Sequence, residues 1–152
     1  MTQLAERSSA AAATAAEFEA AGRALLPGFV GIEFDSVEGG LVTSRLRIER
    51  KHMAPNGFLH AASVIALADT SCGYGSQVSL PPGATGFTTI ELKSNFMGTA
   101  TVGDEIACRA RMVHGGRTTQ VWDAEVADGT GRTLALFRCT QMVLYPRTGV
   151  AA

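Results

Sequence analysis

A single carboxylate interrupts an otherwise apolar stretch near the middle of the chain. In "FLHAASVIALADTSCGYGS" (residues 58–76) almost every residue after Leu59 is apolar or small, yet Asp69 lies in the middle. A carboxylate is rarely buried without a partner, because losing its hydration is costly. Asp69 therefore either reaches a wet rim and caps a neighbouring loop, or faces a pocket that tunes its pKa for nucleophilic or general-base chemistry.

The beginning of the same stretch offers a second chemistry. His60 stands beside the start of a predicted helix, where a lone histidine is more typical of a cap or a core residue than of a catalyst. The first N–H groups of a helix have no partner within it, and the helix dipole favours negative charge there. The amides after His60 could therefore hold the oxygen of an ester or thioester carbonyl. In the preceding loop, Asn56 either orients a substrate or a water molecule, or simply forms an Asn-Gly turn with Gly57.

Several common chemistries find no support in the sequence. It contains neither a G-x-S-x-G nucleophile elbow nor a G-x-x-x-x-G-K-[ST] phosphate loop. Its three histidines, at positions 52, 60 and 114, are too scattered to predict a metal site, and we expect neither a metal nor a cofactor. A net charge of −1 gives no general reason to expect nucleic acid or a membrane as partner.

The cysteines and the absence of long apolar stretches indicate the cellular compartment in which the protein is expected. Cys72, Cys108 and Cys139 are an odd number without metal-like spacing, so we expect buried free thiols of a reducing compartment. No stretch is long and apolar enough to span a bilayer, and the first residues do not resemble a signal or transit peptide. A cytoplasmic protein is the expectation.

The elements that must position Asp69 can be predicted from periodicity. Residues 59–76 should form a helix that is apolar around most of its circumference and is therefore enclosed by other structure. A β-hairpin is expected before it, from residues 29–37 and 41–49. Four strands with alternating polarity should follow, at residues 88–96, 105–113, 119–128 and 132–145. In the first of these, Ile90 and Leu92 alternate with Glu91 and Lys93. The fold class is α+β, with an antiparallel sheet covering one helix.

The two ends of the chain are expected to lie outside this domain. An Ala-rich helix is predicted from about Ala13 to Leu26, ended by Pro27-Gly28. The expected organisation is an N-terminal helical extension at 1–28, one domain at 29–146 and a C-terminal tail at 147–152.

With these residues placed, the chain resembles a known family. The run "HMAPNGFLHAASVIALAD" is similar to the loop H-x-N-P-x-G-x-x-H-G-G and the following helix L-x-D of hotdog-fold acyl-coenzyme A thioesterases, in particular the phenylacetate-pathway (PaaI-type) branch. His60 and Asp69 are nine positions apart, as in the family pattern. The resemblance extends over roughly residues 29–144, including the strand region after the helix.

The resemblance implies a fold, an assembly and a reaction. The fold is a hotdog, in which the sheet wraps around the helix at 59–76. The assembly is a homodimer whose sheets join, usually paired again into a homotetramer, with active sites at the dimer interface. The reaction is hydrolysis of an acyl-CoA, with an aryl or a short to medium acyl group, to the free acid and coenzyme A.

The resemblance also implies roles for particular residues. The amide of Ala61 would hold the thioester carbonyl, His60 would help to orient it, and Asp69 would come from the other subunit as nucleophile or general base. Thr89 matches a position where the family often carries Ser or Thr near the reacting water.

Five further residues are expected to contact the substrate. The Gly116-Arg117 turn matches the one near the coenzyme A arm, Lys93 is a second candidate for its phosphates, and Asn56 and Gly57 belong to the loop beside the substrate.

Two departures from the family pattern leave other functions open. Ala61-Ala62 replaces the usual Gly-Gly, and Ala54 stands where the family has an amide-bearing side chain, six positions before His60. A non-catalytic acyl-CoA-binding protein is one alternative. The other is a hotdog dehydratase or hydratase that pairs His52 with Asp69, although the hydratase loop D-x-N-P-x-H is absent.

Overall fold

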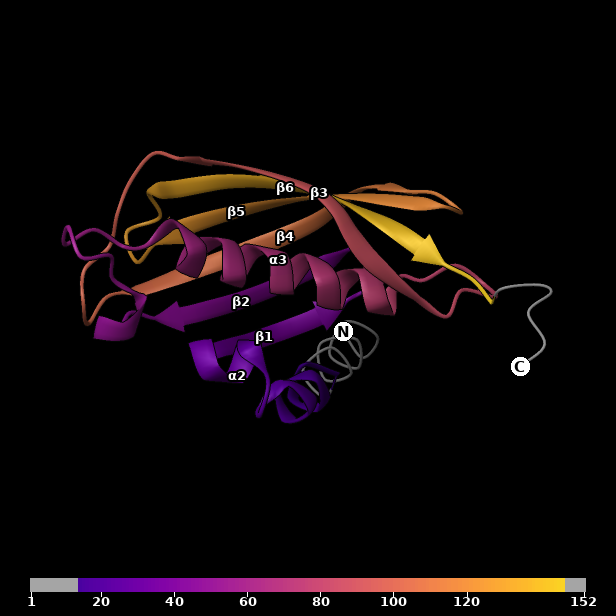
Figure 1. Ribbon diagram of the computed structural model, residues 1–152, viewed down its shortest axis with the longest axis horizontal. Helices are drawn as coiled ribbons and strands as arrows, with labels where there is room; N and C mark the ends of the chain where they lie inside the picture. The colour runs from indigo at the N-terminus through magenta and orange to yellow at the C-terminus, as the bar shows by residue number, and fades with distance from the viewer. Residues whose placement is uncertain (1–13, 147–152) are drawn as a thin grey trace, which may run out of the picture.

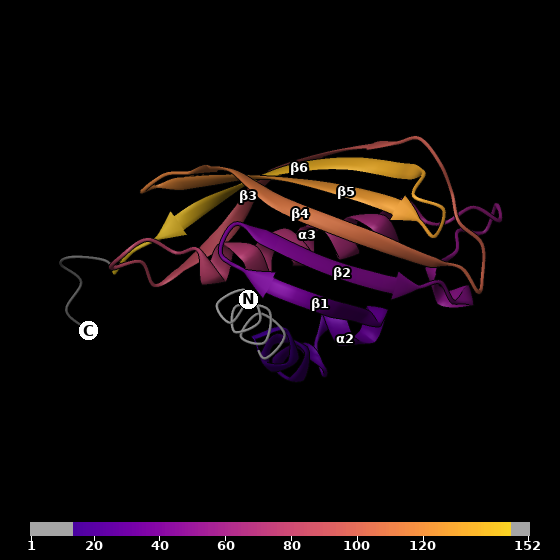
Figure 2. The same ribbon diagram turned by 180° about the vertical axis from the view of Figure 1, so that it is seen from behind.

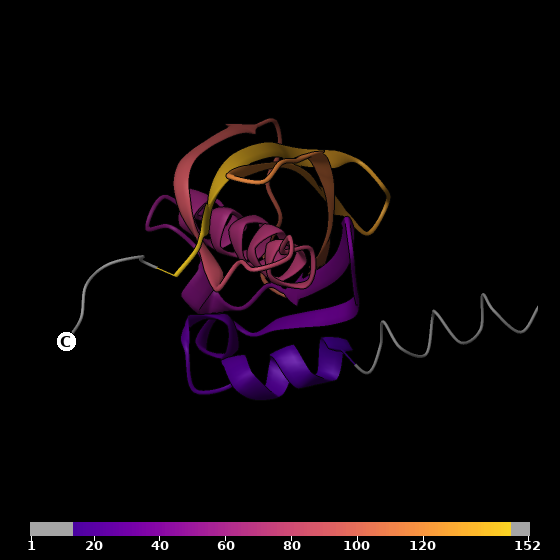
Figure 3. The same ribbon diagram turned by 90° about the vertical axis from the view of Figure 1, so that its right-hand side faces the viewer.

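A curved antiparallel sheet wraps around one long helix in the computed structural model, which describes residues 14–146 (Figures 1 and 3). The helix α3 spans Ala61–Val78, and the strand order across the sheet is β1-β2-β4-β5-β6-β3. The strands are β1 Ile32–Glu38, β2 Leu41–Arg47, β3 Gly86–Phe96, β4 Glu105–Gly115, β5 Thr119–Asp128 and β6 Thr133–Leu144. The predicted α+β class, with the sheet wrapped around the central helix, is confirmed.

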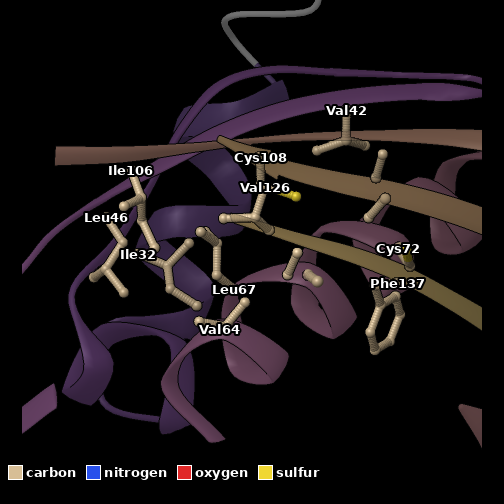
Figure 4. Close-up of a cluster of buried hydrophobic side chains, with 14 of the residues drawn as sticks. Ile32, Val42, Leu46, Val64, Leu67, Cys72, Ile106, Cys108, Val126 and Phe137 are labelled. Carbon is tan, nitrogen blue, oxygen red and sulfur yellow. The ribbon is translucent and has the colours of Figure 1, made fainter. Parts of the chain in front are cut away.

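The core lies between α3 and the concave face of the sheet. Val64, Leu67 and Cys72 of the helix meet inward-facing side chains of the strands (Figure 4). The alternation predicted for residues 105–113 is confirmed, because Ile106 and Cys108 are buried. Seen from behind, the strands cover α3 along its length (Figure 2). All three cysteines are buried free thiols, as predicted.

Small residues let α3 lie close to the sheet. A Cβ atom added at Gly75 would come within 2.4 Å of the Trp122 ring, and one at Gly73 within 3.3 Å of the Phe87 ring. Trp122 is fully buried and its indole N–H donates to Gln120 Oε1 at 3.0 Å. The glycines therefore fix the distance between the helix and strands β3 and β5.

The N-terminal segment differs from the prediction. Residues 14–22 are helical, and a second short helix, α2, spans Leu26–Val30. The expected helix end at Pro27-Gly28 is wrong, since the first helix ends at residue 22 and Pro27 lies in the first turn of α2. The first turn of a helix accepts proline because its N–H would have no partner there anyway. Phe29 and Val30 accordingly lie in α2 and not in the predicted first strand, while Ala13 lies outside the described residues.

Strand β3 forms one edge of the sheet and is more exposed than predicted. It pairs with β6 on one side, and its register shifts between Thr89 and Glu91. Ile90 and Leu92 remain 54% and 42% exposed, although their alternation with charged residues predicts a buried face. An edge strand has backbone groups available for another strand.

No helix within residues 14–146 is both long and apolar enough to cross a membrane.

Candidate active site

Asp69 lies midway along α3, on the side of the helix that faces β3. It is half-buried, and it is the one charged residue in the sequence of α3. Burial raises the pKa of its carboxyl above the ordinary value, and a hydrogen bond from Thr89 acts in the opposite direction. Within the described chain, no basic side chain lies close enough to Asp69 to lower the pKa of its carboxyl. A carboxylate in this setting is more basic than an exposed one.

Thr89 of β3 lies beside Asp69 of the same chain, a contact that was not predicted from the sequence. Its hydroxyl lies 3.4 Å from Asp69 Oδ1 and 2.9 Å from the side-chain oxygen of Gln141. Gln141 belongs to β6, pairs directly with Thr89 in the sheet, and is fully buried.

Gln141 was not among the residues predicted from the sequence. The signal for it is its position in β6, two residues after the buried Cys139 and two before the buried Val143. A polar residue in the inward phase of a strand needs a hydrogen-bonding partner.

His60 is the N-cap of α3, which confirms the capping role that its position suggests. Its backbone is extended, with φ −68° and ψ 132°, so the helix begins at Ala61 rather than at Leu59. The ring accepts a hydrogen bond at Nδ1 from the amide of Ala62 at 3.0 Å. Ala61 then contributes the first N–H of the helix, which has no carbonyl of the preceding turn to bind. Both alanines are exposed residues at the beginning of the helix.

The amide of Ala61 and the carboxylate of Asp69 do not meet within one chain. They are eight residues apart on a continuous helix, which places them about 12 Å apart along its axis. A thioester carbonyl held at Ala61 therefore cannot react with Asp69 of the same chain. A site that uses both groups needs two chains.

The loop before α3 forms the turn that its sequence suggests. Asn56 Oδ1 accepts from the amide of Phe58 at 3.3 Å, and Gly57 has φ 85°, which favours glycine. Gly57 also lines a hollow of about 510 Å³ together with Ala54 and Pro55. The side chain of Asn56 is exposed and its amide group remains accessible.

The residues expected to hold coenzyme A lie away from the beginning of α3. Gly116 and Arg117 form the β4–β5 turn, at the end of the sheet nearer the C-terminus of α3 (Figure 1). The Arg117 guanidinium lies 5.5 Å from the centre of the Tyr145 ring, and Tyr145 donates its hydroxyl hydrogen to the Arg117 carbonyl at 2.6 Å.

Lys93 lies on the opposite side of the sheet from α3. It pairs in register with Arg138, which pairs in turn with Asp123, and all three line a hollow of about 490 Å³ on the convex face. Within one chain, therefore, neither Lys93 nor Arg117 lies near the Asp69 carboxylate.

His52 has a structural role. It is 3% exposed, its Nδ1 accepts from the amide of Glu49 at 2.9 Å, and its Nε2 lies 2.7 Å from the Val30 carbonyl. Both ring nitrogens are therefore occupied in joining the loop to α2. This geometry disfavours the alternative in which His52 and Asp69 form a dehydratase pair.

The sequence of this chain is similar to those of several known proteins. A family model described as the thioesterase superfamily matches residues 56–135. A 1,4-dihydroxy-2-naphthoyl-CoA hydrolase of Listeria monocytogenes is 32% identical over 78% of this chain and 94% of its own. The acyl-coenzyme A thioesterase PaaI of Escherichia coli is 26% identical, over 72% and 75% of the two chains.

Solved structures agree with the fold. A mutant thioesterase of Pseudomonas aeruginosa superimposes with a TM-score of 0.80 at 22% identity, over 86% of this chain and 93% of its own. A Streptococcus mutans protein bound to acetyl-CoA gives a TM-score of 0.71 at 26% identity, over 79% and 94% of the two chains.

Proposed function

Because this chain belongs to the thioesterase superfamily, we propose that it hydrolyses the thioester bond of an acyl-CoA, with Asp69 as the catalytic carboxylate. The products are the free acid and coenzyme A. The observation that carries the assignment of Asp69 is its isolation: a half-buried carboxylate with a raised pKa, without a basic partner in the described chain, on a rigid helix. Such a group is suited to act as a base or a nucleophile near neutral pH.

Two routes use the same groups. In the first, an Asp69 oxygen attacks the carbonyl carbon, coenzyme A leaves as thiolate, and water hydrolyses the resulting mixed anhydride. In the second, Asp69 takes a proton from water as that water attacks the carbonyl. In both, the Ala61 amide stabilises the oxyanion. Single-turnover hydrolysis in H₂¹⁸O identifies the first route when water attacks the Asp69 carbon of the anhydride, because only then does ¹⁸O enter the Asp69 carboxylate.

We propose further that the working unit is a homodimer, paired again into a tetramer. The axial separation of Ala61 and Asp69 supports a site made from two chains. The open edge of β3, with Ile90 and Leu92 half-exposed, supports joining of two sheets there. Closed two-fold symmetry would then create two equal sites.

The acyl group is proposed to be aromatic. The Listeria relative is named for a naphthoyl-CoA substrate and is more similar to this chain than the E. coli PaaI protein, so assignment to the phenylacetate branch is less well supported than an aryl-CoA substrate in general. A hollow of about 240 Å³ beside the beginning of α3 suits such a group. A cavity of about 150 Å³ is known to hold benzene, so this one has room for a larger ring system.

The lining of this hollow is mostly apolar. Leu26, Phe29 and Val30 of α2 face Ala62 and Ala66 of α3 across it. Leu26 and Phe29 are 63% and 75% exposed, which is costly for large apolar side chains without a ligand or partner.

Three polar residues also line this hollow, and each has a partner: Lys51 Nζ lies 3.5 Å from the Glu49 carboxylate. Ser63 donates its hydroxyl hydrogen to the His52 carbonyl at 3.0 Å, and both ring nitrogens of His52 have partners. The site therefore favours an apolar acyl group.

A hydrolysis screen over aryl-, short- and long-chain acyl-CoAs, with detection of the released thiol, tests the function. Aryl-CoA should give the highest kcat/KM. Leu26→Ala and Phe29→Ala should raise KM for aryl-CoA by about tenfold and leave that for acetyl-CoA nearly unchanged. Leu25→Ala is the control, because this neighbour is equally exposed but does not line the hollow. Binding of all thioesters without thiol release would instead identify a non-catalytic binder.

The remaining proposed contacts follow from the resemblance. Arg117 and Lys93 would bind the coenzyme A phosphates, and the loop residues Asn56 and Gly57 would lie along the thioester arm; a guanidinium suits phosphate because of its fork of donors. Arg117→Ala should then raise KM more than it lowers kcat. A cytoplasmic location, supported by the three free cysteines, completes the proposal.

A further inference from the structure

Three side chains from three elements meet behind the proposed catalytic carboxylate. The Thr89 oxygen lies 2.9 Å from Gln141 Oε1 and 3.4 Å from Asp69 Oδ1. A threonine hydroxyl has a single hydrogen, and both neighbours are acceptors. Gln141 and Asp69 therefore compete for one hydrogen, and the shorter contact goes to Gln141.

Gln141 is held in the orientation that makes it an acceptor toward Thr89. The side chain is fully buried, and its amide nitrogen donates to Cys139 Sγ at 3.4 Å. Its neighbour in the sheet, Gln120, uses its own amide nitrogen on the Ser79 carbonyl at 2.9 Å. A buried amide oxygen that accepts no hydrogen bond destabilises the folded state, so the hydrogen bond from Thr89 to the Gln141 oxygen is favourable.

The charged groups of the neighbouring strands are directed away from Asp69. Lys93 of β3 and Arg138 of β6 pair on the convex face, and Glu91 accepts from Thr140 in the same outward phase. On the helix, a hydrogen bond with Cys139 and burial raise the pKa of the Cys72 thiol well above its ordinary value, so Cys72 stays neutral. The hydroxyl of Thr89 is thus the polar group within the described chain that acts directly on the carboxylate.

We infer that Gln141 is a positioning residue, which holds the Thr89 hydroxyl and limits the hydrogen bond that this hydroxyl gives to Asp69. The inference rests on the proposed catalytic role of Asp69. A carboxylate that accepts a full hydrogen bond is a weaker base and a weaker nucleophile. By drawing the hydrogen of Thr89 toward itself, Gln141 keeps Asp69 reactive without touching the substrate.

The test is the pH dependence of kcat/KM in Gln141→Met, which keeps the length of the side chain and removes the strong acceptor. The Thr89 hydrogen then passes fully to Asp69, and the acid limb of the profile should move to lower pH by roughly one unit. The kcat on the plateau should fall about threefold because the base is weaker, and KM should stay unchanged. In a Thr89→Val background the same replacement should have no effect, since Gln141 acts through that hydroxyl.

Gln120→Met is the matched control, because it removes a buried glutamine from the same row that does not contact Thr89. It should lower stability and leave the acid limb in place. An unmoved limb in a folded Gln141→Met protein, or an equal shift in Gln120→Met, would overturn the inference. Gln141→Leu is a second variant that removes the same acceptor but has a differently shaped side chain. If neither variant folds, Gln141 is required only for the fold, and the inference is overturned as well. Asp69→Asn, assayed alongside, separates these outcomes from failure of the proposed function, since an active Asp69→Asn enzyme would remove the carboxylate from the mechanism altogether.

Discussion

Asp69 is a compromise between reactivity and stability. Burial raises the pKa of its carboxyl, so ionisation near neutral pH costs the folded state free energy. The same burial makes the carboxylate more basic once it is ionised. A residue that lowers stability and raises reactivity is typical of an active site.

Asp69→Asn should therefore lower kcat by about 100-fold or more, the scale of general-base catalysis, without loss of the fold. Affinity for a CoA thioester should persist, because the proposed carbonyl contact is the Ala61 amide. Measuring kcat, thioester affinity and thermal stability on this one variant checks the prediction. Full turnover in a destabilised protein would reduce Asp69 to a structural cap.

The stability of the same variant should depend on pH in a definite direction. A carboxyl whose pKa is raised on folding contributes stability that is present at low pH and is lost as pH rises through its folded pKa. Asn cannot ionise, so Asp69→Asn should have a Tm equal to or above that of the wild type at pH 7, with the difference shrinking in acid. Calorimetry between pH 4 and pH 7 measures the difference in Tm between the variant and the wild type. A variant whose Tm lies below that of the wild type at pH 7, but not at pH 4, would contradict the prediction.

At the residue scale, sequence reasoning singled out the carboxylate that we propose as the reactive group and missed the residues around it. A lone carboxylate in an apolar helix can be recognised from the sequence alone, and so can the capping position of His60. Thr89 became a candidate through the resemblance, as a residue near the reacting water, and its contact with Asp69 was not predicted. Gln141 was missed because its partner across the sheet depends on the register of β3 and β6, which alternation does not fix.

At the element scale, the small residues of α3 set how closely the helix approaches the sheet. Gly75→Ala should lower the free energy of unfolding by about 1–3 kcal/mol, because the added Cβ would lie 2.4 Å from the rigid Trp122 ring. Chemical denaturation measures the change. Gly129→Ala is the control, since a Cβ there meets nothing within 4 Å, and it should leave stability nearly unaltered. Equal effects of the two variants would show that the close approach is not responsible.

Most elements could be predicted from the sequence, and the exceptions have physical causes. β5 spans Thr119–Asp128, the predicted range, because turn residues bound a clear alternation. Pro27 was misread because proline both ends helices and begins them. The exposure of β3 could not be predicted, since alternation does not distinguish an edge strand from a central one and the shift after Thr89 breaks its phase.

At the scale of the whole molecule, the proposed site depends on association through β3. Leu92→Lys places a charge at the half-exposed edge and should shift the protein to a folded monomer with little activity. Sedimentation at micromolar concentration, together with the rate of thiol release, checks both effects. Leu25→Lys is the control, an exposed leucine outside the sheet, and should keep the dimer and its activity. A fully active Leu92→Lys monomer would rule out the two-chain site.

The most direct measurement of the central claim is complementation between two damaged chains. Ala61→Pro removes the first amide hydrogen of α3 and little else, because proline is accepted at the first helical position and His60 already has the extended backbone that precedes proline. Asp69→Asn removes the carboxylate. Each variant alone should be nearly inactive.

Produced together in equal amounts, the two chains should recover about a quarter of the wild-type rate per chain, since half of the dimers are mixed and each mixed dimer has one intact site. A rate no higher than that of either parent, from mixtures shown to contain mixed dimers, would contradict a site built from the Ala61 amide of one chain and the Asp69 carboxylate of the other.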